Sequence, residues 1–401
     1  MNSIQREKYS SLPTFYLFSF LLFLTLSGNA QEILWSHPGL GEHPRLTLLG
    51  SESKTEHVLV SSPFGNKITC YNLENGKEVW NRTLSEHLPF RALPLTNAIL
   101  IQGDQGMIWA LQNKDGDMFL EVKNAGPRDY PIAPPTFYNK AVFTLSHIGK
   151  VRKINKKGEV VVETEQDTSW GQRKARPVPL LCLEPQVRFL DQSGRLVTYN
   201  PETLAQQKVS IWPPVDPLSR KGPVQEALAG AISTTSDKLW VADLSGYLQA
   251  FALPEATPIW KVRLASQDNL WSSSGELLVV PTPIKWDDRT ALLVASRNRV
   301  RLFNDATGET IARFRLASPA VCPPVYDRKT EAWWILCERH VVSMRSGQWH
   351  SEQLPIVEQP FSMTVLNDVA TIGVQGGRIY GVLLTKPEEK IPDQASSPAK
   401  R

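Results

Sequence analysis

Short runs of alternating apolar and polar residues, each closed by a turn, recur along most of the chain. In a clear copy, the alternating residues 66–73 are followed by a turn at Asn75-Gly76 and by a second run that ends at Trp80. Alternation with a period of two places the apolar side chains on one face of a strand. A turn between two such runs indicates a hairpin. The pattern therefore predicts a protein of many short strands.

Self-similarity along the chain identifies eight copies of this unit. The copies begin at Asn66, Gly106, Gly149, Gly194, Gly246, Asn298, His340 and Gly377. Their mean spacing is about 44 residues, the length of one four-stranded propeller blade. Gly, Asn and His tolerate the positive φ that we expect in a tight turn between strands. Two residues after each start stands an aliphatic residue expected to point between sheets: Ile68, Ile108, Val151, Leu196, Leu248, Val300, Val342 and Ile379.

These units predict an all-β fold, an eight-bladed β-propeller of four-stranded blades formed by residues 31–384 as one domain. Two further β-rich runs precede each start, so each unit supplies three strands before its second turn and a fourth after it. One such sheet leaves both faces exposed, whereas eight sheets packed around an axis cover one another. The composition agrees, because 12 Trp, 30 Pro and 24 Gly fit many strands and turns better than helices.

The two ends of the chain are expected to close the ring. The last copy has no fourth strand and continues into residues 385–401, a Pro-, Ser- and Lys-containing tail that we expect to be disordered. The missing strand is found at the other end, where residues 32–35 resemble the fourth strand of the complete copies, with Trp35 in the place of Trp80. We therefore expect Ile33 and Trp35 to complete the eighth blade.

Residues 1–30 have the features of a secretory signal peptide. Arg6 and Lys8 precede an apolar run at residues 15–26, and the segment ends in small residues suited to cleavage after Ala30. The run is shorter than the ~20 residues that a membrane-spanning helix needs, which favours a cleaved leader over a retained anchor. We expect an exported protein, periplasmic or extracellular, that does not span a membrane.

Export permits disulfide bonds, and one cysteine pair is a candidate. Cys322 and Cys337 flank a turn at residues 326–331, whose midpoint lies close to the midpoint between the two cysteines. They would face each other across one hairpin and either form a disulfide or act as two small buried apolar residues. Cys70 and Cys182 lie in distant copies and are expected to be buried thiols.

The repeat Gly-x-apolar-x-Ala-Leu/Phe, followed by Thr-Gly-Glu/Lys and then Trp, resembles the repeat of pyrroloquinoline-quinone (PQQ)-type β-propellers. Residues 106–116, 246–260 and 298–308 match it best. This family contains quinoprotein dehydrogenases and exported scaffold propellers, among them the propeller subunit of the outer-membrane β-barrel assembly machinery. The resemblance implies the blade and leaves the chemistry open.

The residues favour the scaffold group over the dehydrogenases. The dehydrogenase pocket characteristically uses an adjacent-cysteine disulfide, a Glu/Asn/Asp calcium set and a catalytic Asp, whereas here no two cysteines adjoin and no calcium set is recognisable. None of the seven histidines has the spacing of a metal pair. We therefore expect no cofactor, no metal and no catalytic residue. The lipid-anchored N-terminal Cys of the assembly-machinery subunit is also missing, so the expectation is a soluble exported propeller.

Two groups of residues exceed what a blade needs and are candidate contact sites. One is basic and is either a patch for an acidic glycan, a lipid headgroup or an acidic protein segment, or a solvated face. It comprises Lys150, Arg152, Lys153, Lys156, Lys157, Arg173, Lys174 and Arg176. The other consists of aromatic residues on long connections, which either contact a partner or pack over blade edges. These are Trp170, Trp212 and Trp271.

The sequence as a whole predicts an exported, non-catalytic scaffold that binds a protein partner in the periplasm or cell envelope as a monomer. A formal net charge of +4 without a concentrated basic stripe argues against binding to nucleic acid. The alternatives left open are a degenerate quinoprotein-type enzyme, a hydrolase that uses the central channel, and a glycan-binding propeller.

Overall fold

The described part of the chain consists of strands and their connections. The structure is a computed structural model, and the residues it describes are 31–49, 56–123, 129–164, 181–183, 186–190, 195–210, 227–235, 237–243, 246–253, 255–264, 278–286, 289–345 and 347–384. Within these residues there are 32 strands and no helix. The prediction of an all-β protein is thus confirmed.

The strands form four-stranded antiparallel sheets, eight in the described residues. The first is β2 (Arg45–Leu49), β3 (His57–Ser61), β4 (Lys67–Asn72) and β5 (Glu78–Thr83), and the second is β6 (Leu93–Pro94), β7 (Ala98–Gln102), β8 (Met107–Gln112) and β9 (Met118–Lys123). The third is β10 (Thr136–Tyr138), β11 (Ala141–Leu145), β12 (Val151–Ile154) and β13 (Val160–Glu163), and the fourth is β14 (Leu181–Leu183), β15 (Gln186–Leu190), β16 (Arg195–Tyr199) and β17 (Gln206–Ser210).

The remaining four sheets follow in chain order. The fifth is β18 (Ala227–Thr234), β19 (Lys238–Asp243), β20 (Tyr247–Ala252) and β21 (Thr257–Arg263), and the sixth is β22 (Thr282–Trp286), β23 (Arg289–Ser296), β24 (Arg299–Asn304) and β25 (Thr310–Arg315). The seventh is β26 (Val325–Asp327), β27 (Ala332–Leu336), β28 (His340–Arg345) and β29 (Gln348–Gln353). The eighth joins β30 (Pro360–Leu366), β31 (Val369–Val374) and β32 (Ile379–Leu383) to β1 (Glu32–His37).

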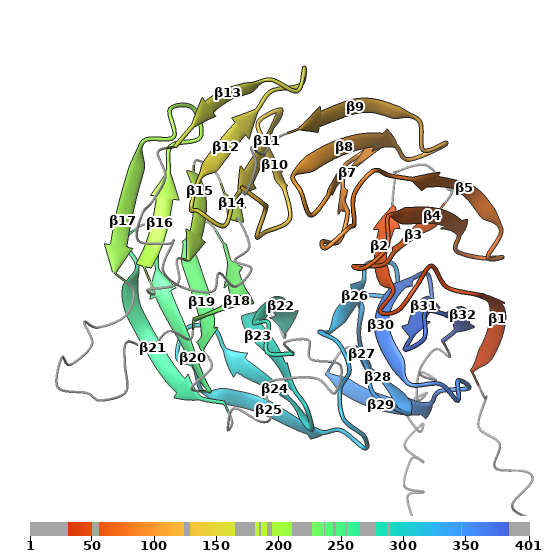
Figure 1. Ribbon diagram of the computed structural model, residues 1–401. Coiled ribbons are helices and arrows are strands. Elements are labelled where there is room, and N and C mark those ends of the chain that lie inside the picture. The colour runs from red at the N-terminus through yellow and green to blue at the C-terminus, as the bar shows by residue number, and fades with distance from the viewer. Residues whose placement is uncertain are drawn as a thin grey trace, which may run out of the picture.

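The sheets are arranged radially, as in a β-propeller. Figure 1 shows them following one another around a centre in chain order, with the first strand of each sheet innermost and the fourth outermost. The hydrophobic core lies between neighbouring sheets: one cluster, for example, joins Leu59 and Ile68 of the first sheet to Ile99 and Trp109 of the second. Among the described residues, neighbouring sheets thus bury apolar faces against each other, which a single sheet could not do.

The repeat starts that the sequence identifies stand at the third strand of each sheet. The aliphatic residue two positions later is at most 2% exposed in all eight copies. The turn geometry differs from the expectation in part. Gly106, Gly149, Gly246 and Gly377 have φ between +76° and +93°, whereas Asn66, Asn298 and His340 are not among the described residues with positive φ. Those three turns therefore do not require a residue that tolerates the left-handed region.

At several sheet boundaries a tryptophan packs on a glycine turn of the next sheet. Trp80 on β5 donates its indole N–H to the carbonyl oxygen of Asn113 on the next sheet, with 3.0 Å between nitrogen and oxygen. Its ring lies on Gly116, where an added Cβ would stand 2.6 Å from the ring. Trp260 packs in the same way on Gly308. The motif read in the sequence as turn glycine and strand tryptophan is thus an intersheet contact.

The chain ends meet in the eighth sheet. β1 pairs antiparallel with β32, so that Ile33 lies opposite Val382 and Trp35 opposite Gly381. Trp35 is 8% exposed and donates its indole N–H to the carbonyl oxygen of Leu73 at 2.8 Å, whereas Ile33 is 39% exposed. The two side chains therefore differ in role, because Trp35 packs between the sheets while Ile33 contributes mainly through its backbone.

Candidate functional site

Three described members of the basic cluster predicted around Lys150 are paired with neighbouring carboxylates. Arg152 on β12 is buried and hydrogen-bonds the carboxylates of Asp129 and Glu163. Lys150 forms a second ion pair with Glu163, with 2.5 Å between Nζ and Oε1. Burial alone would lower the pKa of Arg152, but the hydrogen bonds to Asp129 and Glu163 outweigh it and raise that pKa. Arg152 is therefore a structural cation.

The rest of the predicted cluster does not form one surface in the described residues. Lys153 is paired with Glu202 of the next sheet at 2.5 Å. Lys156 and Lys157 are exposed on the β12–β13 turn. Arg173, Lys174 and Arg176 lie outside the described residues, as do the three predicted contact tryptophans Trp170, Trp212 and Trp271. Of the described members, only the two turn lysines are solvated cations.

The disulfide considered for Cys322 and Cys337 is not present, and both are buried thiols. Val325 on β26 pairs with Trp334 on β27. If this pairing continued for three more residues along each strand, Cys322 would lie opposite Cys337. The consecutive residues Pro323 and Pro324 interrupt the pairing, and beyond them Ala320 bridges to Cys337. Cys322 packs in the core toward β30–β32 and Cys337 in the core toward β22–β25. Burial, with smaller effects of Cys322 and Glu338, raises the pKa of Cys337 to about 12.

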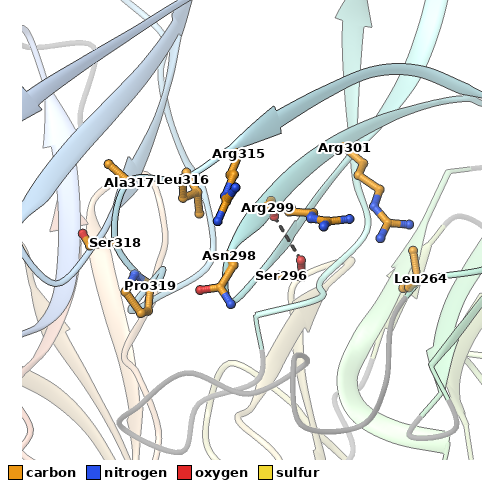
Figure 2. A pocket seen from close by; sticks show the side chains of 10 residues that line it. All are labelled: Leu264, Ser296, Asn298, Arg299, Arg301, Arg315, Leu316, Ala317, Ser318 and Pro319. Atoms are coloured by element: carbon orange, nitrogen blue, oxygen red, sulfur yellow. Dashed lines mark hydrogen bonds between the residues drawn. The ribbon is translucent and has the colours of Figure 1, made fainter.

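A cavity of about 540 Å³ lies where β23 turns into β24, and we call it the arginine pocket. Its lining comes from the β23–β24 turn, from β24, β25 and the segment after β25, and from the end of β21 on the preceding sheet. Figure 2 shows Arg315, Arg299 and Arg301 following one another across the pocket toward Leu264. The full lining is Leu264, Ser296, Asn298, Arg299, Arg301, Arg315, Leu316, Ala317, Ser318 and Pro319.

The pairing of β24 with β25 concentrates positive charge at this pocket. Arg299 lies directly opposite Arg315, and Arg301 lies opposite Arg313. Like charges in opposed positions of a sheet repel each other. Burial lowers the pKa of Arg301, and the charges of Arg313 and Arg299 lower it further. The guanidinium of Arg301 donates to the carbonyl oxygen of Arg263, 3.5 Å away on β21. The folded chain thus holds these cations together at an electrostatic cost.

Two cations on other sheets have a carboxylate partner on the following sheet. Arg82 pairs with Asp117 at 3.0 Å, and Lys238 pairs with Asp305. Within the part of the chain that the structure describes, no carboxylate lies within ion-pair distance of Arg299, Arg301, Arg313 or Arg315. Among the described residues the charge of the arginine pocket is therefore uncompensated, and an anionic group is the chemistry that it can bind.

The sequence alone does not predict this site, because charge density along the chain does not show which charges are paired. The cluster near Lys150 is dense in sequence, yet Glu163 returns to it through strand pairing and Glu202 reaches it from a turn of the next sheet. The pocket arginines are spread over residues 299–315 and meet only when the hairpin forms. The available signal was an Arg-x-Arg pair on each arm of one predicted hairpin, which places all four side chains on the same face.

The described residues contain neither a metal-binding cluster nor a membrane-spanning helix. No group of three or more His, Cys, Asp or Glu residues there is arranged to hold a metal ion. The same residues include no helix that is long and apolar enough to cross a bilayer.

Comparison with known proteins identifies relatives at the level of family and fold. A family model described as outer membrane protein assembly factor BamB, of the PQQ-repeat type, matches residues 27–245. The crystal structure of BamB from Moraxella catarrhalis is similar with a TM-score of 0.63 and 15% sequence identity, and covers 88% of this chain and 100% of that one. A crystal structure of the computationally designed Ika8 protein has a TM-score of 0.63 and 12% identity, covering 87% of this chain and 100% of that one. A search of curated proteins returned no match. The arginine pocket lies beyond the residues that the family model matches.

Proposed function

We propose that this chain, which belongs to the PQQ-repeat family of the outer membrane protein assembly factor BamB, is an exported scaffold that holds a protein partner in the cell envelope and catalyses no reaction. The observation that carries the proposal is the family match over residues 27–245. The name of that family describes an assembly factor, which is a role in bringing proteins together. A propeller suits such a role because its sheets hold the intervening loops on a rigid support.

We further propose that the eight sheets are the blades of one closed ring spanning residues 31–384. Its support is the pairing of β1 with β32, together with contacts between the eighth and first sheets. The hydroxyl of Ser362 donates to the carbonyl oxygen of Pro44 at 2.5 Å, and the side chain of Asn367 donates to the carboxylate of Glu56. A ring closed in this way keeps each rim in a fixed shape, which a binding surface requires.

The location in the cell envelope is supported by the leader-like residues 1–30 and by the family name. The full-length chain with a C-terminal tag, produced in a Gram-negative bacterium and separated by cell fractionation, should appear in the envelope fraction with a new N-terminus at Gln31. The matched control lacks residues 2–30 and should stay in the cytoplasm. Full-length, uncleaved protein in the cytoplasm would contradict export.

The scaffold role is tested by capture of the tagged protein from mildly solubilised envelopes, followed by mass spectrometry. A defined envelope protein should co-purify in a constant ratio, and it should be lost when residues 31–37 are deleted, because the ring then lacks its last strand. The same preparation, incubated with PQQ and Ca²⁺ and then freed of unbound PQQ by gel filtration, should show neither quinone absorbance nor dye reduction with alcohols. Dye reduction dependent on PQQ, or the absence of any stoichiometric partner, would overturn the proposal.

A further inference from the structure

In the described residues, the arginine pocket combines charge that has no carboxylate partner with a strand edge that has no strand partner. β25 is the outermost strand of its sheet, and β24 is its single strand partner among the described residues. The outer edge of β25 therefore offers backbone N–H and C=O groups that are not used in the sheet. An edge of this kind accepts a further strand from another chain.

The exposed side chains of β25 repeat with the period of a strand. Ile311, Arg313 and Arg315 are exposed, and the residues between them point toward the neighbouring sheet. Arg299 and Arg301 continue the charged face onto β24, where they stand opposite Arg315 and Arg313. Alternate residues in a strand are spaced by about 6.8 Å, so these cations match alternate residues of a second extended strand.

We propose that the arginine pocket and the outer edge of β25 bind an extended acidic segment of the partner protein, with a carboxylate at every second position. The inference rests on the scaffold function proposed above and names the chemistry of the partner. Its carboxylates would be held by the guanidinium groups of Arg299, Arg301, Arg313 and Arg315. Its backbone would pair with β25, while Ile311 offers an apolar contact at the far end of the same face.

A protein segment fits these observations better than a phosphate or a lipid headgroup. A single phosphate would occupy one pair of arginines and would leave the backbone edge of β25 unused. The four arginines are laid out along two strands, and only a ligand with charges repeating at the strand spacing would engage all of them. The pocket also contains Asn298 and Ser318, whose polar groups suit an extended polar chain.

The probe is a fluorescent ten-residue peptide in which Glu alternates with Thr, and its control has Gln in place of every Glu. Fluorescence anisotropy with the purified chain of residues 31–401 should show saturable binding of the Glu peptide and none of the Gln peptide. Binding should weaken as salt is raised, because the contact surface is exposed. Equal binding of both peptides, or binding of neither, would overturn the proposal.

Two variants with the same change in net charge locate the site. Arg313→Gln with Arg315→Gln removes the two exposed arginines of β25, and Lys156→Gln with Lys157→Gln removes two exposed cations from another sheet. The first variant should weaken peptide binding by about tenfold or more, and the second should change it by less than about twofold. Thermal unfolding of both variants verifies that they are folded. Equal weakening by the two variants would mean a nonspecific charge effect and would overturn the proposal.

Strand pairing and the alternative ligands are tested with the same assay. A Glu peptide N-methylated at alternate residues, on the edge that would face β25, should lose binding, since it cannot donate those hydrogen bonds. Inorganic phosphate should displace the Glu peptide no better than chloride at the same ionic strength. Vesicles of phosphatidylglycerol should displace it no better than neutral vesicles. Full binding of the methylated peptide, or tight vesicle binding that depends on Arg313 and Arg315, would replace the proposal with an anion or membrane site.

The chain carries its own acidic residues between β21 and β22, Asp268 and Glu276, which lie outside the described residues. If Asp268→Asn with Glu276→Gln tightens peptide binding, the pocket arginines have an internal partner and the proposal falls. Capture of the partner from envelopes shows whether the acidic-segment proposal fails alone or together with the scaffold proposal. A partner that is lost with Arg313→Gln/Arg315→Gln supports both proposals, whereas a partner that is retained leaves the scaffold standing and overturns the acidic-segment proposal.

Discussion

At the scale of the residue, the turn glycine of a blade has two separate reasons to be glycine. Gly116 has φ of +68°, a conformation that residues with a Cβ rarely adopt. It also lies under the ring of Trp80, which would stand 2.6 Å from an added Cβ. Gly376 has φ of +95° but no atom within 4 Å of an added Cβ. A comparison of Gly116 with Gly376 therefore separates the cost of backbone strain from the cost of disturbed intersheet packing.

We expect Gly376→Ala to lower the free energy of unfolding by about 1–2 kcal/mol through backbone strain alone. Gly116→Ala should lower it by about 3 kcal/mol or more, because Trp80 must also move from its packed position. Equilibrium unfolding in urea measures both values. Equal losses in the two variants would show that the tryptophan contact contributes nothing beyond the turn conformation.

The ion pairs of Glu163 give a pH dependence with a defined sign. Burial alone would raise the pKa of Glu163, but hydrogen bonds from Lys150 and Arg152 outweigh it and lower the pKa below its usual range. A folded-state pKa below the unfolded one adds stability that is complete above the unfolded pKa and is lost as pH falls through the folded one. The difference in unfolding free energy between the wild type and Glu163→Gln should therefore be constant from pH 7 to about 5 and shrink below. Glu255→Gln, on an exposed turn, is the control and should parallel the wild type.

At the scale of the element, the sequence predicts whatever depends on local periodicity. Ile68 and its seven counterparts were expected to be buried from alternation alone, and they are. Register is harder, because it depends on interruptions in both strands. Cys322 and Cys337 are symmetric about their turn in sequence, but the adjacent prolines at 323 and 324 shift the pairing so that Ala320 bridges to Cys337. A symmetric spacing therefore predicts a contact only where the ladder is continuous.

Strand β1 provides a direct comparison of buried and exposed side chains at the seam. Trp35→Ala should lower the free energy of unfolding by about 3–5 kcal/mol, because it removes a ring packed on Gly76 and Gly381. Ile33→Ala on the same strand should cost less than about 1 kcal/mol, since its side chain is 39% exposed. Urea unfolding at constant pH gives both values. Similar losses would mean that the strand acts through pairing alone, without the tryptophan contact.

At the scale of the whole molecule, the repeat pattern predicts eight copies, and the described residues form eight four-stranded sheets. The copies can be counted because each carries its own turn and strand signals. The charged surface depends on which side chains meet across sheets. Lys153 meets Glu202 from the next sheet, while Arg301 meets Arg313 within its own hairpin. Such partners are separated by a dozen to fifty residues, and local composition does not report them.

The connection between β32 and β1 leads to a test of the ring as a whole. Glu32 pairs directly with Leu383 and the strands are antiparallel, so the start of β1 lies beside the end of β32. A permuted chain that begins at residue 38 and carries residues 31–37 after Leu384, joined by an Asn-Gly turn, would turn the eighth sheet into an ordinary up-and-down blade. Only the linkage changes, and every β1 contact can form.

We expect the permuted chain to unfold in urea within about 1 kcal/mol of the parent chain of residues 31–384, because a short hairpin loop replaces no packed contact. The chain of residues 38–384, which lacks β1, should be less stable by several kcal/mol, because Trp35 no longer packs on Gly76 and the edge of β32 is open. Adding a synthetic peptide of residues 31–37 to that shortened chain should restore part of the loss in proportion to its concentration. A permuted chain as unstable as the shortened one would mean that the two ends of the chain do not hold the ring together.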